Sequence, residues 1–441
     1  MQNANVGRKE YKSMIAFDQY RCHLLDLANR LLKEQRWPSS ARELSAALNG
    51  QPGWVLRTVV EPEARRLSGA YFTGSHLAKK LLTPWAKSIK TDHVKLFDPA
   101  CGAGDLLLAA ARYLPVRKTL QETINFWGEC LSGYDIHKTF VRTAKVRLIL
   151  LAIERGVTCD KLPNSDETFP GILCGDYFQS SPTKGITHIV MNPPFTLIPA
   201  PNDCKWGQGL VNEAAIFLEK TLKTAELRTE FAAILPDVLR TGSRYRRWRE
   251  TISDMGVMGK ITIAGHFGTA DVDVFTLYMK KSQQANINQT SWWDSRAGKT
   301  IGDLFDVNVG PVVPHRDPKS GIRAPFFDTG SANTWSILHQ PVKWRKYSGR
   351  LFKSPLVVIR RTSSPSDRNR ACASVINIST EAAIENHLLV LTPKDGRLAT
   401  CTRLMQWLRR DDASRWLNKR IRCRHLTVGS IATLPFEKEP S

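Results

Sequence analysis

The chain has 441 residues, of which 42% are hydrophobic, 9% aromatic and 24% charged, and 63 Lys and Arg against 41 Asp and Glu give a formal net charge of +22. This composition is typical of a globular protein with more than one core, and it excludes a disordered tail, a coiled-coil rod and a small disulfide scaffold. So large a basic excess favours a polyanionic partner, most simply nucleic acid.

Three further features bear on where the chain acts. No apolar run approaches the roughly 20 residues that cross a bilayer. The amino terminus (MQNANVGRKEYK) lacks the apolar segment of a secretory signal. The nine cysteines are scattered and never form a C-x-x-C pair, as in a protein with reduced thiols. We therefore expect a cytoplasmic protein that binds no membrane.

Residues 1–65 are expected to form a short N-terminal helical segment. Leucines at helical spacing between Leu24 and Leu32 predict one helix, and Ser40 is the expected cap of a second that runs through Leu48 to Asn49-Gly50. We interpret this segment as a cap or docking element for a ligand or partner that the pattern does not identify.

Residues 66–282 have the pattern of an α/β domain. Short β-branched runs alternate there with helical stretches: VKLFD, CLSGYD, GILCGD, HIVMNPP, FAAILP, ITIAGHF and DVFTLYM. This alternation predicts βαβ units and a Rossmann-like parallel sheet with helices on both faces. Residues 283–441 carry Gly/Pro/Asp turns, tryptophans and dense arginine, which predicts a second, mixed domain.

The segment LFDPACGAGDLLLAAARYL is a strand, a glycine turn and a helix. Gly102 and Gly104 allow the backbone to turn sharply and to approach a ligand, and the helix start offers unpaired N–H groups. Asp98 precedes the glycines, where a carboxylate would repel a phosphate but attract an amine. S-adenosylmethionine, with its ammonium group, sulfonium and ribose diol, fits this chemistry; a ligand-free βα turn is the alternative.

Two more acids follow apolar strands. Asp135 in LSGYDIH could accept the hydrogens of a ribose diol, as in dinucleotide-binding folds. Asp176 in ILCGDYF could accept from an adenine amino group. Each acid alone is more often a helix cap, but three successive strand ends that each carry one favour a common ligand.

The strand THIVM continues into Asn192-Pro193-Pro194-Phe195. Two prolines remove two donors and restrict φ, so the backbone carbonyls here are held rigid and remain free to accept. Asn192 adds a side-chain acceptor and Phe195 an aromatic face. Converging acceptors suit an exocyclic amine, because they take its hydrogens and leave its nitrogen lone pair free to attack. A proline-stiffened turn without chemistry is the alternative interpretation.

These motifs, together with GAYFT at residues 69–73, resemble the S-adenosylmethionine-dependent amino-methyltransferases of DNA, in the gamma motif order of the adenine-N6 enzymes. The resemblance covers roughly residues 66–281 and departs from the family at Gly74, where a proline is usual. It implies that the cofactor contacts are Thr73, Asp98, Ala100, Gly102, Gly104, Asp135, Ile136, Asp176 and Tyr177. It implies that the catalytic residues are Asn192, Pro193, Pro194 and Phe195, with Phe195 and Phe267 stacking on the flipped base.

The resemblance implies double-stranded DNA as the substrate, because an adenine amine must be rotated out of the helix before it can react. It makes residues 283–441 a target-recognition domain and makes a cognate restriction endonuclease or defence-system subunit a candidate partner. Basic side chains would contact the DNA backbone. We expect them in two clusters: Arg240, Arg244, Arg246, Arg247 and Arg249; and Lys343, Arg345, Lys346, Arg360 and Arg361. The ten histidines show no metal-ligand spacing, so no metal site is expected.

Three other functions remain open from the sequence. Similar tetrapeptides serve enzymes that methylate ribosomal RNA or the N4 amine of cytosine. A glutamine methyltransferase acting on protein also holds an amide in this way, but it would explain neither the basic charge nor the GAYFT segment. A DNA-binding subunit could retain the fold without catalysis, although the intact glycine turn and tetrapeptide argue against it. The oligomeric state is not predicted.

Overall fold

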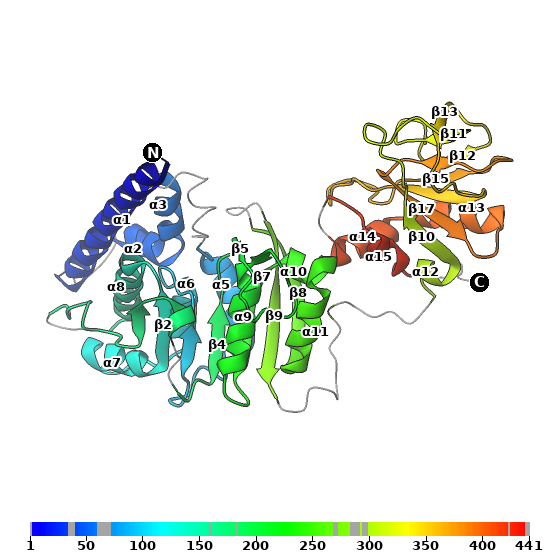
Figure 1. Cartoon of the computed structure of the whole chain (residues 1–441). Coiled ribbons are helices and arrows are strands. Elements are labelled where there is room, and N and C mark those ends of the chain that lie inside the picture. Colours follow the sequence, from blue (N-terminus) through cyan, green and yellow to red (C-terminus); the bar gives the residue numbers. More distant parts are fainter. Residues whose placement is uncertain are drawn as a thin grey trace. The chain divides into compact units, whose positions relative to one another are not determined.

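The seven runs expected to be strands lie in one seven-stranded sheet (Figure 1). The computed structural model describes residues 2–33, 40–59, 72–157, 161–180, 184–267, 272–282, 292, 299–421 and 424–436. In sheet order the strands are β3 (Ile172–Cys174), β2 (Leu131–Asp135), β1 (Leu96–Asp98), β4 (His188–Met191), β7 (Glu230–Pro236), β9 (Val272–Lys281) and β8 (Gly256–Phe267). The predicted α/β class is confirmed.

The sheet differs from a fully parallel one at a single strand. β9 runs antiparallel to both of its neighbours, β7 and β8. Only four residues separate β8 from β9 in the chain, too few for the crossover that a parallel pair requires. Strands β3, β2, β1 and β4 are parallel neighbours, so their carboxyl ends share one edge.

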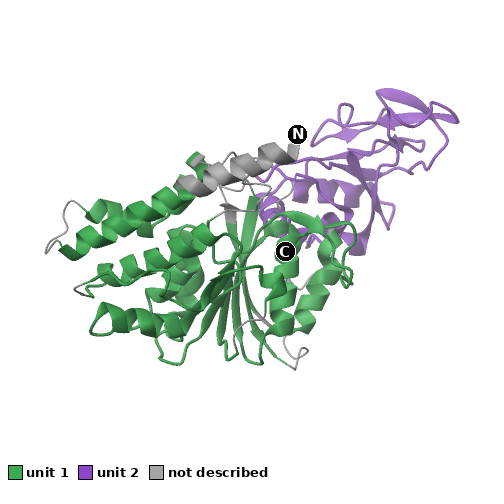
Figure 2. Ribbon diagram, turned by 60° about the vertical axis from the view of Figure 1, so that its left-hand side comes forward, with its two compact units in different colours: residues 1–240, 244–290 green, residues 241–243, 291–441 purple. Residues whose placement is uncertain are grey.

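Helices cover both sides of this sheet (Figure 2). In chain order they are α5 (Ser75–Leu82), α6 (Asp105–Ala111), α7 (Leu120–Cys130), α8 (Lys138–Glu154), α9 (Glu213–Thr224), α10 (Asp237–Thr241) and α11 (Arg246–Asp254). Helix α7 begins with a capping box between Thr119 and Glu122. Helix α8 is buried over most of its length, because it is enclosed between the sheet and the N-terminal helices.

The N-terminal segment forms α1 (Gln2–Lys33), α2 (Ala41–Leu48) and α3 (Gln51–Val59), so the predicted helices are present. Leu24, Leu27 and Leu31 of α1 belong to the same hydrophobic core as the sheet and α8. The proposed boundary between residues 65 and 66 lies outside the described residues, as do Gly69, Ala70 and Tyr71 of the GAYFT segment. The N-terminal helices are therefore part of the structure that supports the sheet.

The chain divides into two compact units, residues 1–240 with 244–290 and residues 241–243 with 291–441. In the second unit a five-stranded sheet has the order β10 (Phe305–Val309), β17 (Leu388–Pro393), β14 (Leu356–Arg360), β15 (Ala373–Ile376) and β12 (Ile337–Leu338). A three-stranded sheet has the order β13 (Lys343–Tyr347), β11 (Ile322–Phe327) and β16 (Ala383–Ile384). Helices α12 (Ile301–Leu304), α13 (Leu398–Leu408), α14 (Asp411–Arg420) and α15 (Val428–Ala432) complete it. No helix in the described part of the chain could span a bilayer.

Three arginines expected on a DNA-contacting surface are buried instead. Arg240 pairs with Asp237 at 2.8 Å, and Arg249 donates to the carbonyl of Leu239 at 2.8 Å. In the second unit Arg345 is buried and donates to a backbone carbonyl at 2.6 Å. Charge in a sequence does not distinguish a surface cation from one that satisfies interior carbonyls, and these three residues belong to the second kind.

Candidate active site

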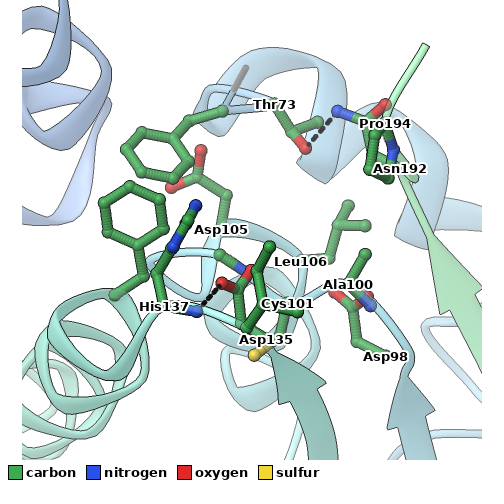
Figure 3. A pocket seen from close by; sticks show the side chains of 14 residues that line it. Thr73, Asp98, Ala100, Cys101, Asp105, Leu106, Asp135, His137, Asn192 and Pro194 are labelled. Carbon is green, nitrogen blue, oxygen red and sulfur yellow. Dashed lines mark hydrogen bonds between the residues drawn. The ribbon is translucent and has the colours of Figure 1, made fainter. Parts of the chain in front are cut away.

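A pocket lies at the carboxyl edge of the sheet, where three strands end side by side (Figure 3). β1 ends at Asp98, β2 ends at Asp135, and Asn192 directly follows β4. Because β1 pairs in parallel with both β2 and β4, these ends meet. The pocket is lined by Phe72, Thr73, Asp98, Ala100, Cys101, Gly102, Asp105, Leu106, Asp135, Ile136, His137, Phe140, Asn192 and Pro194.

The glycine turn forms the floor between β1 and α6. Gly102 and Gly104 have φ angles of 52° and 85°, a left-handed backbone that glycine adopts without strain. A Cβ on Gly102 would lie 3.0 Å from the Phe72 ring, and one on Gly104 would lie 2.8 Å from the Cβ of Ala144 in α8. Both glycines are therefore required by conformation and by close packing.

Gly104→Ala is expected to lower the free energy of unfolding by about 2–4 kcal/mol, since the left-handed strain adds to the contact with Ala144. Gly156→Ala is a matched control, because Gly156 has a φ of 83° and open space around its Cα. That control should lose only the conformational part, about 1–2 kcal/mol. Urea denaturation measures both, and equal losses would show that the contact with Ala144 costs nothing.

Asp98 is completely enclosed at the end of β1. One carboxylate oxygen accepts from the Ala100 N–H at 3.1 Å. Burial, with smaller contributions from the nearby Asp135 and Asp105, raises the pKa of Asp98 to about 8. Burying an ionised carboxylate without a counter-charge costs free energy, so a cation that entered the pocket would be bound strongly by Asp98.

Asp135 joins the end of β2 to the glycine turn. Its two carboxylate oxygens accept from the His137 N–H at 2.8 Å and from the Gly102 N–H at 2.9 Å. Burial raises the pKa of Asp135, while these two N–H groups and His137 oppose the rise. The carboxylate is held in one orientation with acceptor capacity left over, since each oxygen has two lone pairs.

Asp105, at the first position of α6, holds the opposite wall. It accepts from the Gly74 N–H at 2.8 Å and pairs with Arg147 of α8 at 2.8 Å. Arg147 has 0% of its side chain exposed and also donates to the carbonyl of Ala47 in α2 at 2.8 Å. A single buried ion pair thus links the N-terminal helices, the glycine-turn helix and the backbone next to Thr73.

Asn192 combines a fixed amide with a free acceptor. Its Nδ2 donates to Thr73 Oγ1 at 3.0 Å, so the orientation of the amide is set (Figure 3). Its Oδ1 is buried and has no hydrogen-bond partner among the described residues. A buried acceptor without a partner costs about 1–3 kcal/mol, and a donor that entered the pocket would relieve this cost.

The backbone after Asn192 is held by hydrogen bonds from residues at the start of α9. Asn212 donates its side-chain N–H to the Phe195 carbonyl at 2.9 Å, and the Glu213 N–H donates to the Thr196 carbonyl at 2.8 Å. Phe195 itself is partly buried against the main core. The tetrapeptide is accordingly a rigid edge of the pocket.

Some predicted residues do not line this pocket. Asp176 lies at the end of β3 and accepts from the Phe178 N–H at 2.8 Å, as the cap of a short 3-10 helix. Tyr177 is buried, stacks on Phe217 at 5.7 Å and donates its hydroxyl hydrogen to Thr221 at 3.2 Å. The roles assigned to Asp176 and Tyr177 remain predictions.

Three other predicted residues lie beside the lining or outside the described side chains. Pro193 is buried and lies between the lining residues Asn192 and Pro194 in the chain. Phe195 directly follows Pro194. Phe267 ends β8, where its backbone pairs with Val272, but its side chain is outside the described part of the chain. Its stacking role therefore remains a prediction.

An aromatic wall of the pocket was not predicted. Phe72 and Phe140 both line the pocket, with ring centroids 5.1 Å apart. Phe17 of α1 packs on both, at 5.9 and 4.8 Å, and His137 contacts Phe140 at 4.8 Å. The available signal was the spacing of His137 and Phe140, three residues apart at the start of the helix that follows Asp135.

Comparison with known proteins identifies the family and the fold. The family model described as N-6 DNA methylase matches residues 53–296, more than half of the chain. The structure of the type IIL restriction-modification enzyme MmeI in complex with DNA is similar, with a TM-score of 0.53 and 14% identity over 86% of this chain and 70% of that one. At this identity the similarity shows a shared fold.

A second similar structure is that of the type IIG restriction endonuclease BpuSI, with a TM-score of 0.45 and 14% identity. The match covers 92% of this chain and 64% of that one. This chain thus spans less than two thirds of the length of BpuSI.

Proposed function

The chain belongs to the N-6 DNA methylase family, and on this basis we propose that it transfers a methyl group from S-adenosylmethionine to the N6 amine of a flipped-out adenine in double-stranded DNA. The observation that carries this proposal is that the buried Oδ1 of Asn192 has no hydrogen-bond partner in the described part of the chain, on a residue that lines a pocket with three acids. An acceptor held without a donor is what an incoming amine requires.

The tetrapeptide would act on the amine by accepting its hydrogens. Asn192 Oδ1 takes one N–H, and the Pro193 carbonyl takes the other. With both hydrogens so held, the nitrogen lone pair would leave conjugation with the base ring and attack the methyl carbon. The methyl–sulfur bond would break as the C–N bond forms, and the amine would release one hydrogen to solvent as a proton. Thr73 keeps Asn192 in place, because its Oγ1 occupies the amide Nδ2. The protein thereby orients the amine without a covalent intermediate.

The acids and the turn would hold the cofactor, whose sulfonium supplies the methyl group when it is bound. Asp98 would pair with its ammonium group and Asp135 would accept from its ribose hydroxyls. The N–H groups at the start of α6 and the Phe72 and Phe140 rings complete a polar and apolar lining. Thr73 has its hydroxyl hydrogen left to donate to the cofactor carboxylate, since its oxygen accepts from Asn192.

Phe195 would stack on the extruded adenine, offsetting part of the unstacking cost of a few kcal/mol. Phosphates would be contacted by exposed arginines that follow β7 in the chain, such as Arg244, Arg246 and Arg247. The net charge of +22 agrees with a substrate of this kind.

The proposed activity is tested with the full chain, radiolabelled S-adenosylmethionine and unmethylated genomic DNA. Digestion of the product to nucleosides should yield N6-methyladenine. Recovery of N4-methylcytosine would instead assign the cytosine amine as the acceptor. Label that enters ribosomal RNA or protein but not DNA would contradict the proposal.

We also propose that the chain modifies DNA within a restriction-modification or defence system, with a cognate nuclease or subunit as partner. The test is to sequence host DNA for modified bases with and without the gene. Loss of N6-methyladenine from one short sequence motif is the expected result, and an unchanged modification pattern would contradict it.

Asp98 should make cofactor binding release a proton. Because burial raises the pKa of Asp98 to about 8, roughly nine-tenths of this carboxyl is protonated in the free protein at pH 7. Only the ionised form pairs well with an ammonium group, so binding at pH 7 should release about one proton per cofactor. Calorimetry in two buffers of different ionisation enthalpy measures this number.

The control for this measurement is Asp98→Asn, which has no proton to lose and should bind the cofactor more weakly without proton release. In the unchanged chain the released number should fall towards zero as the pH rises above 8, where the carboxyl is already ionised. A number near zero at pH 7 in the unchanged chain would assign the ammonium group to another residue.

A further inference from the structure

The segment directly after the tetrapeptide is a β-hairpin with an exposed apolar face. It consists of β5 (Leu197–Pro199) and β6 (Leu210–Asn212), paired antiparallel with Pro199 opposite Leu210. Successive side chains of a strand point to opposite faces. Val211 is fully buried, whereas Leu197 is 59% and Leu210 52% exposed, and Pro199 is exposed with them.

This face is held at a fixed place relative to the tetrapeptide. The Asn212 side chain donates to the Phe195 carbonyl at 2.9 Å, and its backbone N–H donates to the Tyr245 hydroxyl at 3.0 Å. The side chains of Thr196 and Glu213 are hydrogen-bonded across the base of the hairpin. The exposed leucines cannot shift independently of Asn192.

The chemistry around the hairpin points to DNA as the surface that covers it. Arg244 donates to the backbone carbonyl of Gln208 in the hairpin loop at 2.5 Å, which holds a cation beside the apolar face. Proteins that unstack DNA insert apolar side chains between base steps and use basic side chains in the groove as well. The net charge of +22 also favours DNA over an apolar protein surface.

The short distance along the chain between the hairpin and Phe195 also favours DNA as the surface that covers this face. Leu197 is two positions after Phe195, and two positions of an extended chain span at most about 7 Å. Neighbouring bases of one strand are about 3.4 Å apart along the helix axis. A flipped adenine rotates about its own backbone, so the strand positions on either side of it would stay close to Phe195, to Leu197 and, through the pairing of Pro199 with Leu210, to Leu210.

Building on the proposed function, we propose that Leu197, Pro199 and Leu210 pack against the base stack at the gap left by the flipped adenine. Extrusion of a base exposes the apolar faces of its former neighbours to water. Side chains that cover these faces favour the extruded state over the stacked one. The hairpin thereby lowers the cost of base flipping without contact to the reacting amine.

The experiment compares the double variant Leu197→Ser/Leu210→Ser with Leu227→Ser. Leu227 is 50% exposed and precedes β7, at the opposite edge of the sheet from the tetrapeptide. Two duplexes carry the sequence methylated in genomic DNA, one with the target adenine paired and one with it mismatched. Cofactor affinity and the melting temperature check that each variant is folded.

We expect the double variant to lose at least tenfold in kcat/KM on the paired duplex and less than threefold on the mismatched duplex, where unstacking is already cheap. Leu227→Ser should change kcat/KM by no more than twofold on either duplex. Fluorescence of 2-aminopurine at the target position should rise on binding of the unchanged chain and rise less with the double variant.

Equal losses on both duplexes, or no loss, would overturn the inference while leaving the proposed function intact. A double variant that loses a protein partner or a self-associated state, but keeps its DNA kinetics, would assign the face to a protein instead. An unchanged chain that methylates neither duplex would overturn both the proposed function and this inference.

Discussion

Asn192→Ala is expected to reduce methyl transfer to DNA about 1000-fold, while the affinity for the cofactor changes little. The variant removes the buried Oδ1, which alone in the amide is free to accept a hydrogen from the substrate, and the loss of one such preorganised group typically costs 100- to 1000-fold or more. Single-turnover rates with saturating DNA and cofactor measure the effect on the transfer step.

Asn192→Asp is the matched variant for this prediction. Aspartate retains an acceptor oxygen, but in place of the N–H that donates to Thr73 Oγ1 it has a second oxygen, which would accept the Thr73 hydroxyl hydrogen proposed for the cofactor carboxylate. It should therefore recover part of the rate lost in Asn192→Ala and bind the cofactor less well. A rate for Asn192→Ala above one tenth of that of the unchanged chain would contradict the role of this amide.

Arg147→Met is expected to lower the free energy of unfolding by about 3–5 kcal/mol. The substitution leaves the Asp105 carboxylate buried without its counter-charge and the Ala47 carbonyl without its donor. The cofactor KM should rise as well, because Asp105 also holds the Gly74 N–H next to Thr73. Urea denaturation and initial rates at varied cofactor concentration measure these two effects.

The chain offers a matched surface pair for comparison. Arg112, at the end of α6, pairs with Glu154 of α8 at 2.9 Å, with side chains 36% and 31% exposed. Arg112→Met breaks an ion pair between the same two helices and should cost at most about 1 kcal/mol. Similar losses in the two variants would mean that burial adds nothing to the Arg147 pair.

A third variant separates the ion pair from packing. In Asp105→Asn/Arg147→Met no uncompensated charge remains, so part of the stability lost in Arg147→Met should return. The cofactor KM should stay high, because the amide is a weaker acceptor for the Gly74 N–H. A double variant no more stable than Arg147→Met would place the loss in packing rather than in charge.

Local patterns predicted the elements of this site because the features that produce them are local. The glycine turn follows from Gly102 and Gly104, whose left-handed backbone only glycine adopts readily. The meeting of Asp98 and Asp135 follows from two strands that are parallel neighbours. In the first case a short run of residues contains the physical cause, and in the second a strand–helix–strand unit does.

Contacts between distant segments were not predictable in this way. Arg147 and Ala47 are 100 residues apart, and nothing near either one indicates the other. Arg240 and Arg249 were assigned to a DNA surface, yet they satisfy interior groups. Whether a charged side chain faces water or a buried carbonyl depends on the packing of the whole unit.

By itself the sequence determined the α/β class, the order of its strands along the chain, and the acids and tetrapeptide on which the proposed chemistry rests, since periodicity, turn residues and side-chain types are local properties. Only the tertiary structure decided that Phe17 of α1 supports the aromatic wall formed by Phe72 and Phe140. It also decided that Asn192 Oδ1 has no partner among the residues that the structure describes and that Leu197, five positions further along the chain, remains exposed. Burial and hydrogen-bond pairing are properties of three-dimensional packing, and no single segment encodes them.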